Sequence, residues 1–136
     1  MNRERHLAKA GATVLLVEDN EPLGAYAALA LVDHGCKVLG PAASVSEALS
    51  ILDEEKPDAA VLDYKLASEE TSTPVLLMLE ELNVPVCVIS GHIRAELPPN
   101  FLMHAFLQKP FGLQDLLEVI DRLLIRSHAP RPTIRQ

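Results

Sequence analysis

Five short apolar runs, each bounded by polar or turn-forming residues, divide the sequence at regular intervals. Most of these runs are continuously apolar, which is typical of strands buried on both faces of a parallel sheet. The longest begins at Val84 and ends at Ser90-Gly91. The predicted strands cover residues 13–17, 37–39, 59–62, 84–89 and 105–107.

The segments between these runs repeat apolar residues at the three- and four-residue spacing of helices. Three of them open on recognisable start signals: Asn20 with Pro22, the capping-box pattern Ser44-x-x-Glu47, and Thr73-Pro74. The first helix is predicted to end near His34-Gly35. The expected apolar faces contain Leu23, Ala27 and Ala30; Val45, Ala48, Leu49 and Leu52; Val75, Met78, Leu79 and Leu82; and Leu113, Leu116, Leu117, Ile120, Leu123 and Leu124.

Alternation of strands with helices predicts an α/β fold with a five-stranded parallel sheet covered on both faces, because parallel neighbours need right-handed crossover connections. Residues 92–102 are the exception. Pro98-Pro99 limits any helix there to a short or distorted one.

A chain of 136 residues, about half of them apolar, can bury one core but not two. We expect a polar leader over residues 1–11, one domain over 12–126 and a basic tail over 127–136. The leader has no apolar segment of the secretory type, and no run is long enough to span a membrane. These features predict a cytoplasmic protein that makes no membrane contact.

The net charge argues against a nucleic-acid-binding protein, and the cysteines argue against a disulfide or a cysteine metal site. A formal net charge of −7 repels the nucleic-acid backbone, so no nucleic-acid partner is expected. Cys36 and Cys87 stand in apolar stretches with no ligand at metal-binding spacing, which favours reduced core residues.

Polar residues that can support chemistry stand at the ends of the predicted strands: Glu18, Asp19, Asp63, Ser90 and Lys109. In parallel sheets these ends share one edge, where sites form. If the strand order is 2-1-3-4-5, three carboxylates meet there and repel each other unless a cation lies among them. Oxygen ligands suit Mg2+.

A carboxylate beside Mg2+ can act as a nucleophile toward a phosphoryl donor. Asp63 is the candidate, with Lys109 and the Ser90 hydroxyl able to bind phosphoryl oxygens. A plainer interpretation is also open, in which Glu18 and Asp19 are helix caps or solvated loop residues and Ser90-Gly91 is a turn.

Four motifs in order give the chain a resemblance to the receiver domain of bacterial two-component response regulators, over residues 13–126. They are Val-Glu-Asp-Asn at 17–20, Leu-Asp-Tyr-Lys-Leu at 62–66, Ile-Ser-Gly at 89–91 and Gln-Lys-Pro-Phe at 108–111. The resemblance implies the flavodoxin-like, CheY-like sheet order 2-1-3-4-5, in a stand-alone receiver of a phosphorelay.

The resemblance also implies roles for individual residues. Glu18, Asp19, Asp63 and the main-chain carbonyl of Lys65 would bind Mg2+. Phe106 would be the switch aromatic, and the Lys109-Pro110 peptide bond would be cis. Lys65 and His92 flank Asp63 closely enough to affect hydrolysis of an acyl phosphate, and a solvated loop side chain is the plainer interpretation of each.

The implied partners are a sensor histidine kinase or phosphotransfer protein and a downstream protein target, with a weak homodimer possible. The resemblance implies a signalling activity, with at most self-catalysed phosphotransfer and dephosphorylation in place of enzymatic turnover. The chain departs from the family pattern at residues 67–72 and at Pro98-Pro99, so a pseudo-receiver that works without phosphorylation stays an alternative. An Asp-nucleophile phosphohydrolase is disfavoured, because Lys65 stands where a second acid is needed.

Overall fold

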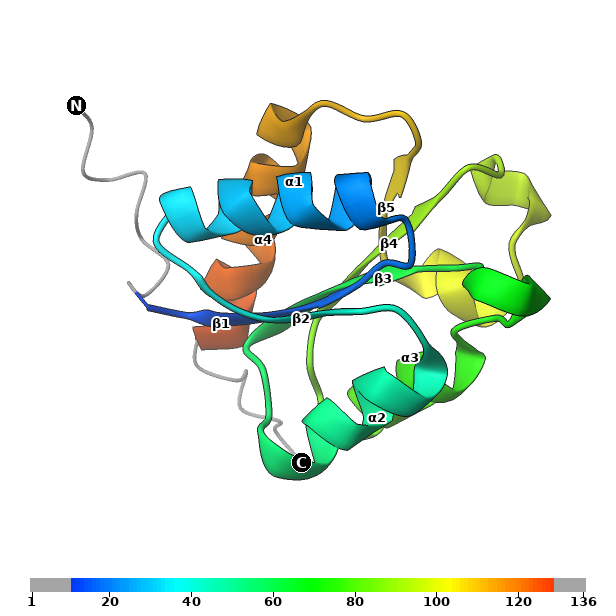
Figure 1. The fold of residues 1–136 in the computed structure, drawn as a ribbon, viewed down its shortest axis with the longest axis horizontal. Coiled ribbons are helices and arrows are strands. Elements are labelled where there is room, and N and C mark those ends of the chain that lie inside the picture. Colours follow the sequence, from blue (N-terminus) through cyan, green and yellow to red (C-terminus); the bar gives the residue numbers. More distant parts are fainter. Residues whose placement is uncertain (1–10, 129–136) are drawn as a thin grey trace, which may run out of the picture.

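The computed structural model describes residues 11–128, and its centre is a five-stranded parallel sheet (Figure 1). The strand order is β2-β1-β3-β4-β5, so the chain runs from the first strand to one edge and then crosses to the other side. The strands are β1 (Thr13–Val17), β2 (Lys37–Ala42), β3 (Ala59–Asp63), β4 (Val86–Ser90) and β5 (Ala105–Gln108). The predicted fold class and strand order are confirmed.

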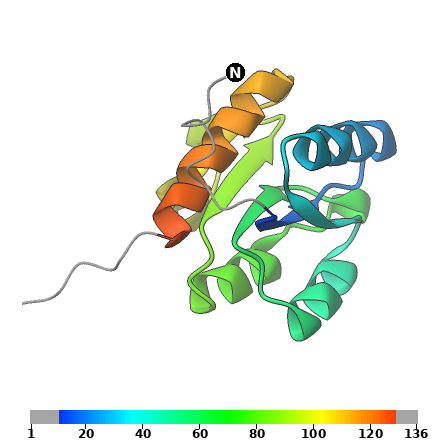
Figure 2. The same ribbon diagram turned by 90° about the vertical axis from the view of Figure 1, so that its left-hand side faces the viewer.

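Helices cover both faces of this sheet (Figures 1 and 2). α1 (Glu21–Asp33) and α4 (Leu113–His128) pack on one face, whereas α2 (Val45–Glu54) and α3 (Thr73–Glu81) pack on the other. Strands β1, β3 and β4 are buried along their whole length. Their continuous apolar sequence follows directly from burial on two sides.

The proline-containing segment between β4 and β5 forms no α-helix. It contains two short 3-10 helices, η3 (Arg94–Glu96) and η4 (Pro99–Met103). A third 3-10 helix, η2 (Ala67–Glu69), follows β3. The expectation of a short or distorted helix over 92–102 is confirmed. Phe101 of η4 is fully buried and joins the core between the sheet, α2 and α3.

The buried faces of α1 and α3 differ from the predicted ones. In α1 the buried residues are Gly24, Ala27 and Leu31, whereas Leu23 and Ala30 are only half-buried. Gly24 faces inward because Pro41 lies against it: a Cβ atom at Gly24 would be 3.3 Å from the Pro41 Cβ.

In α3 the prediction was wrong for Met78, which is 36% exposed, and it missed Leu76, which is fully buried. Val75 and Leu79 are buried as expected. Leu76 joins the core cluster on this face of the sheet, and apolar spacing alone does not reveal which of several apolar residues of a helix faces inward.

Gly40 in β2 adopts a backbone conformation that side chains disfavour, with φ of +103°. A Cβ atom there would lie 2.6 Å from both the Leu16 oxygen and the Ala42 nitrogen. The register between β1 and β2 shifts at this point, and the Ala42 carbonyl accepts a hydrogen bond from the Glu18 N–H at 2.8 Å. Gly40 therefore helps to place the chain at Glu18.

The predicted leader over 1–11 and tail over 127–136 lie almost wholly outside the described residues, although α4 itself runs to His128. Among the described helices, none combines the length and apolar character required to cross a bilayer.

Candidate functional site: an acidic cluster with a lysine

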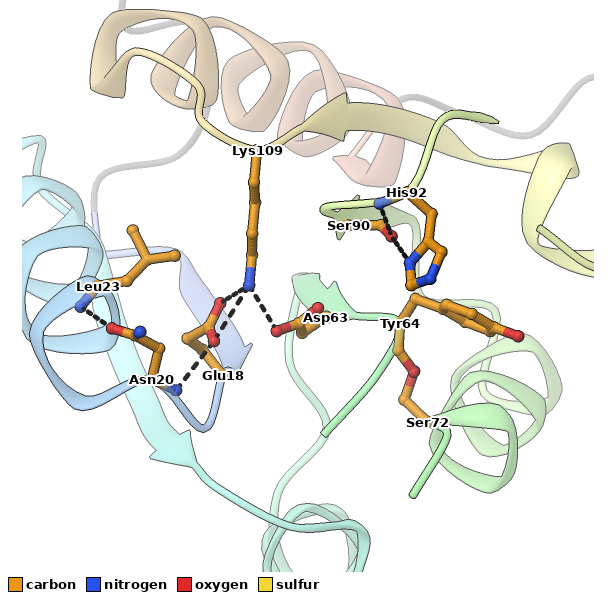
Figure 3. Close-up of polar contacts among 9 residues, drawn as sticks. All are labelled: Glu18, Asn20, Leu23, Asp63, Tyr64, Ser72, Ser90, His92 and Lys109. Carbon is orange, nitrogen blue, oxygen red and sulfur yellow. Dashed lines mark hydrogen bonds and ion pairs between the residues drawn. The ribbon is translucent and has the colours of Figure 1, made fainter. Parts of the chain in front are cut away.

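The carboxyl edge of the sheet brings together the residues that the sequence places at strand ends. Asp63 ends β3 and Glu18 directly follows β1, and these strands are paired with Val17 opposite Leu62. One carboxylate oxygen from each of Glu18, Asp19 and Asp63 lies within 4.8 Å of the others. Glu18 and Asp63 are each only 3% exposed. Figure 3 shows this arrangement for Glu18 and Asp63.

Lys109, which follows β5, extends into this cluster (Figure 3). Its Nζ atom donates a hydrogen bond to Asp63 Oδ2 at 2.8 Å and to Glu18 Oε2 at 3.3 Å. One ammonium group thus contacts two buried carboxylates, so the cluster contains more acidic groups than basic ones.

Burial shifts the pKa values of Lys109 and Asp63 in opposite directions. Burial raises the pKa of Asp63 to about 7, and Glu18 adds to the rise, while the hydrogen bond from Lys109 opposes it. Burial alone would lower the pKa of Lys109, but its contacts with Asp63 and Glu18 outweigh burial and raise it. The ion pair between Lys109 and Asp63 therefore forms progressively as the pH rises through this pKa and the Asp63 carboxyl ionises.

The cluster has the donor set that a hard divalent cation prefers. All three side chains offer carboxylate oxygens, and no described His or Cys joins the group. Glu18 Oε1 is buried without a hydrogen-bond partner, although it lies 3.1 Å from Lys109 Nζ. Since an unpartnered buried carboxylate oxygen is costly, this atom fits a metal ligand.

The start of α1 tests the capping interpretation of the acidic pair. The N-cap is Asn20, whose side chain accepts a hydrogen bond from Leu23 N at 2.9 Å. Glu18 Oε2 accepts from the Asn20 N–H at 3.0 Å, which fixes the Glu18 side chain. Neither Glu18 nor Asp19 is the helix cap.

Ser90 ends β4 beside this cluster and is 1% exposed. Its Oγ atom accepts a hydrogen bond from the His92 N–H at 2.9 Å and lies 3.3 Å from His92 Nδ1. The Ser90 carbonyl accepts from the Lys109 N–H at 2.8 Å, which ties the end of β4 to the start of the Lys109 loop. The Lys109-Pro110 peptide bond is cis, as the resemblance implies.

Among the described residues, the side chains of Phe106 and Lys65 take no part in the hydrogen bonds of the cluster. Phe106 is half-buried on β5, opposite Val88 in the strand register, and packs against the core beneath α2 and α3. The Lys65 side chain leaves the cluster and donates to Glu69 Oε1 at 2.8 Å. The structure therefore does not bring the Lys65 ammonium to Asp63.

Tyr64 was not singled out by the sequence. Its ring makes edge contacts with His92, at 6.0 Å between centroids, and with Phe101, at 4.9 Å. The only sequence signal was its position directly after Asp63, and that position does not reveal which rings surround it.

The loop after Asp63, which departs from the family pattern, is anchored at both ends. The Tyr64 carbonyl accepts hydrogen bonds from the backbone N–H and the hydroxyl of Ser72, which is fully buried. Farther along the loop, Glu70 Oε1 accepts a hydrogen bond from Val45 N at the start of α2. The unusual sequence thus forms a defined structure next to the site.

Comparison with known proteins agrees with the fold. The model of the response regulator receiver domain family matches residues 14–121. The fold is thus that of a two-component signalling domain, and the chain belongs to the response regulator receiver domain family.

Among curated proteins, the chain is 24% identical over 116 residues to the transcriptional regulatory protein PdtaR of Mycobacterium tuberculosis. The match covers 83% of this chain but 57% of that relative, so the chain spans little more than half of its length.

Solved structures of similar fold include SdrG from Sphingomonas melonis Fr1, with 28% identity and a TM-score of 0.74 over 85% of this chain and 98% of that one. A response regulator receiver protein from Sinorhizobium medicae WSM419 is 25% identical, with a TM-score of 0.74 over 87% and 98%. The receiver domain of a Luxo repressor protein from Vibrio parahaemolyticus, at 23% identity, shows the same fold with a TM-score of 0.76 over 86% and 92%.

Proposed function

We propose that this protein is the phosphoacceptor of a two-component phosphorelay and that it accepts a phosphoryl group on Asp63. The observation that carries the proposal is the 2.8 Å contact between Lys109 Nζ and Asp63 Oδ2 inside a cluster of three carboxylates. A buried nucleophilic carboxylate with an adjacent ammonium is suited to phosphoryl transfer.

In the proposed reaction a carboxylate oxygen of Asp63 attacks the phosphorus of a phosphohistidine. The nitrogen–phosphorus bond breaks, its electron pair stays on the imidazole nitrogen, and an acyl phosphate forms on Asp63. Lys109 then offers its charge to a phosphoryl oxygen, and the Ser90 hydroxyl is available for another. A magnesium ion held by Glu18, Asp19, Asp63 and the main-chain carbonyl of Lys65 would supply positive charge to the transferring oxygens.

The proposed donor is a sensor histidine kinase or a phosphotransfer protein, and the output is contact with a downstream protein. Phosphorylation would draw Ser90 and Lys109 toward the new group and change the packing of Phe106 on β5. The protein would catalyse at most its own phosphorylation and dephosphorylation and would not turn over a substrate.

The anchored loop at residues 67–72 is the one observation that favours a second function, that of a pseudo-receiver that binds a partner without phosphorylation. Ser68 and Glu69 have φ of 62° and 61°, so this loop has an unusual backbone path beside Asp63. The complete set of Glu18, Asp63 and Lys109 argues against this alternative.

Incubation with Mg2+ and acetyl phosphate, followed by intact mass spectrometry, tests the proposal. We expect the mass of one phosphoryl group to be added to the wild type and to Asp53→Asn, a matched change on the exposed surface of α2, but not to Asp63→Asn. Absence of the adduct in the wild type would favour the pseudo-receiver. Sustained consumption of acetyl phosphate over many equivalents would indicate a phosphohydrolase.

A further inference from the structure

The Ser90 hydroxyl is hydrogen-bonded to His92, a residue that has no part in the proposed function. Among the residues that the structure describes, Ser90 Oγ bonds to His92 alone, through the His92 N–H and through Nδ1 of its ring. The side chain that is expected to bind a phosphoryl oxygen is therefore already occupied (Figure 3).

The chemistry of a hydroxyl group assigns the direction of these bonds. The oxygen accepts from the His92 N–H, which leaves its single proton in need of an acceptor. Ser90 is 1% exposed, and a buried donor without an acceptor is costly. Nδ1 of His92, at 3.3 Å, accepts this proton in the neutral imidazole tautomer that carries its own proton on Nε2.

We propose that His92 is a positioning residue that competes with the phosphoryl group for the hydroxyl proton of Ser90. One proton can be donated to one acceptor at a time, so Ser90 must leave Nδ1 before it donates to a phosphoryl oxygen. His92 thus stabilises the unphosphorylated state. This inference rests on the proposed function, because it needs a phosphoryl group at Asp63.

The surroundings of the His92 ring hold it in this position. The Tyr64 ring meets it edge-on, with planes at 88°, and Tyr64 in turn meets the buried Phe101 ring at 78°. The imidazole, although exposed to solvent, is therefore backed by an aromatic ring that the core supports. Loss of the bond to Ser90 frees the imidazole to move against Tyr64, which makes Tyr64 a reporter of the exchange.

Affinity for beryllium fluoride, a non-hydrolysable mimic of the phosphoryl group, measures the competition in the presence of Mg2+. Removal of one competing hydrogen bond in His92→Ala should tighten binding about 3- to 10-fold, in line with the usual net contribution of such a bond. His92→Asn should bind close to the wild type, because its side-chain oxygen is the same number of bonds from Cα as Nδ1 and can accept the proton.

The same substitutions in a Ser90→Ala background separate this mechanism from a change in space or charge near Asp63. Without the hydroxyl, His92→Ala should no longer alter the affinity, since the coupling between the two positions passes through that proton. A similar tightening with and without Ser90 would overturn the inference, as would equal affinities of the wild type and His92→Ala.

Fluorine NMR gives a second readout. The chain has two tyrosines, Tyr26 and Tyr64, so 3-fluorotyrosine labelling should give two signals that Tyr64→Phe assigns. Beryllium fluoride should shift the Tyr64 signal of the wild type and leave exposed Tyr26 on α1 unchanged as a reference. If the wild type fails to bind beryllium fluoride, the proposed function fails as well; if it binds but Tyr64 does not respond, only the present inference fails.

Discussion

Nζ of Lys109 lies 2.8 Å from Oδ2 of Asp63, although the two residues are 46 positions apart in the sequence. Strand β4 lies between β3 and β5, so the lysine side chain must extend past the end of β4 to reach the aspartate. This reach makes the pair sensitive to the positions of three strands at once. It also places a long, flexible cation where a new phosphoryl group would appear.

The raised pKa of Asp63 predicts a pH-dependent stability in the absence of metal. Between its ordinary value of 3.8 and about 7, the folded state binds the proton more tightly than the unfolded state, so stability is lost as pH rises through this window. Relative to Asp63→Asn in EDTA, the wild type should therefore gain about 2 kcal/mol between pH 8 and about pH 5.5. Denaturant unfolding at both pH values measures this gain.

The matched variant Asp53→Asn on α2 keeps Asp63, so relative to Asp63→Asn it should gain as much stability as the wild type between the same two pH values. A wild type that loses stability relative to Asp63→Asn on acidification would contradict the prediction, since it would mean that folding favours the ionised carboxyl.

Magnesium should stabilise the folded protein, because a ligand that binds only the native state adds to its stability by mass action. At a concentration 100 times the Kd, the gain is about 2.7 kcal/mol, which corresponds to a rise in Tm of roughly 10 °C. Glu18→Gln should abolish most of this gain, whereas Glu21→Gln in the exposed first turn of α1 should keep it. Thermal unfolding with Mg2+ and with EDTA provides the measurement, and an equal response of both variants would count against the acidic cluster as the metal site.

Gly40→Ala should destabilise the protein by about 2 kcal/mol or more, because φ of +103° and contacts at 2.6 Å leave no room for a Cβ atom. Gly112→Ala is the control: Gly112 has an ordinary φ, and its nearest neighbour would be a side-chain oxygen at 3.6 Å. Urea unfolding should separate the two variants clearly. Similar losses in both would show that the bend in β2 tolerates a side chain.

Phe101 of η4 and Phe106 of β5 should differ in what they contribute to stability and to signalling. Phe101 is fully buried, so Phe101→Ala should cost about 3–5 kcal/mol of unfolding free energy. Phe106 is half-buried, so Phe106→Ala should cost less while altering the response to phosphorylation. Urea unfolding measures the two stability losses, and fluorine NMR of Tyr64 with beryllium fluoride measures the response. A larger stability loss in Phe106→Ala than in Phe101→Ala would contradict the prediction.

The order of strands and helices could be predicted from the sequence because it depends on local patterns. Continuous apolar runs marked the strands, Asn20 and Ser44 marked helix starts, and Pro98-Pro99 marked a segment unable to form a regular helix. The acids and the lysine at strand ends could be assigned to one edge because parallel strands share their direction. The prediction that these side chains meet therefore depended on the strand order, which the family motifs implied.

Only the tertiary structure decided which neighbours these residues meet. The inward face of α1 depends on Pro41 lying against Gly24, and the partner of the Ser90 hydroxyl is His92, held by Tyr64. Likewise, burial of Asp63 raises its pKa, and the residues that flank Asp63 in the sequence do not predict this shift. Sequence patterns report the period and the ends of elements, whereas side-chain partners and electrostatic environment depend on how segments distant along the chain pack together.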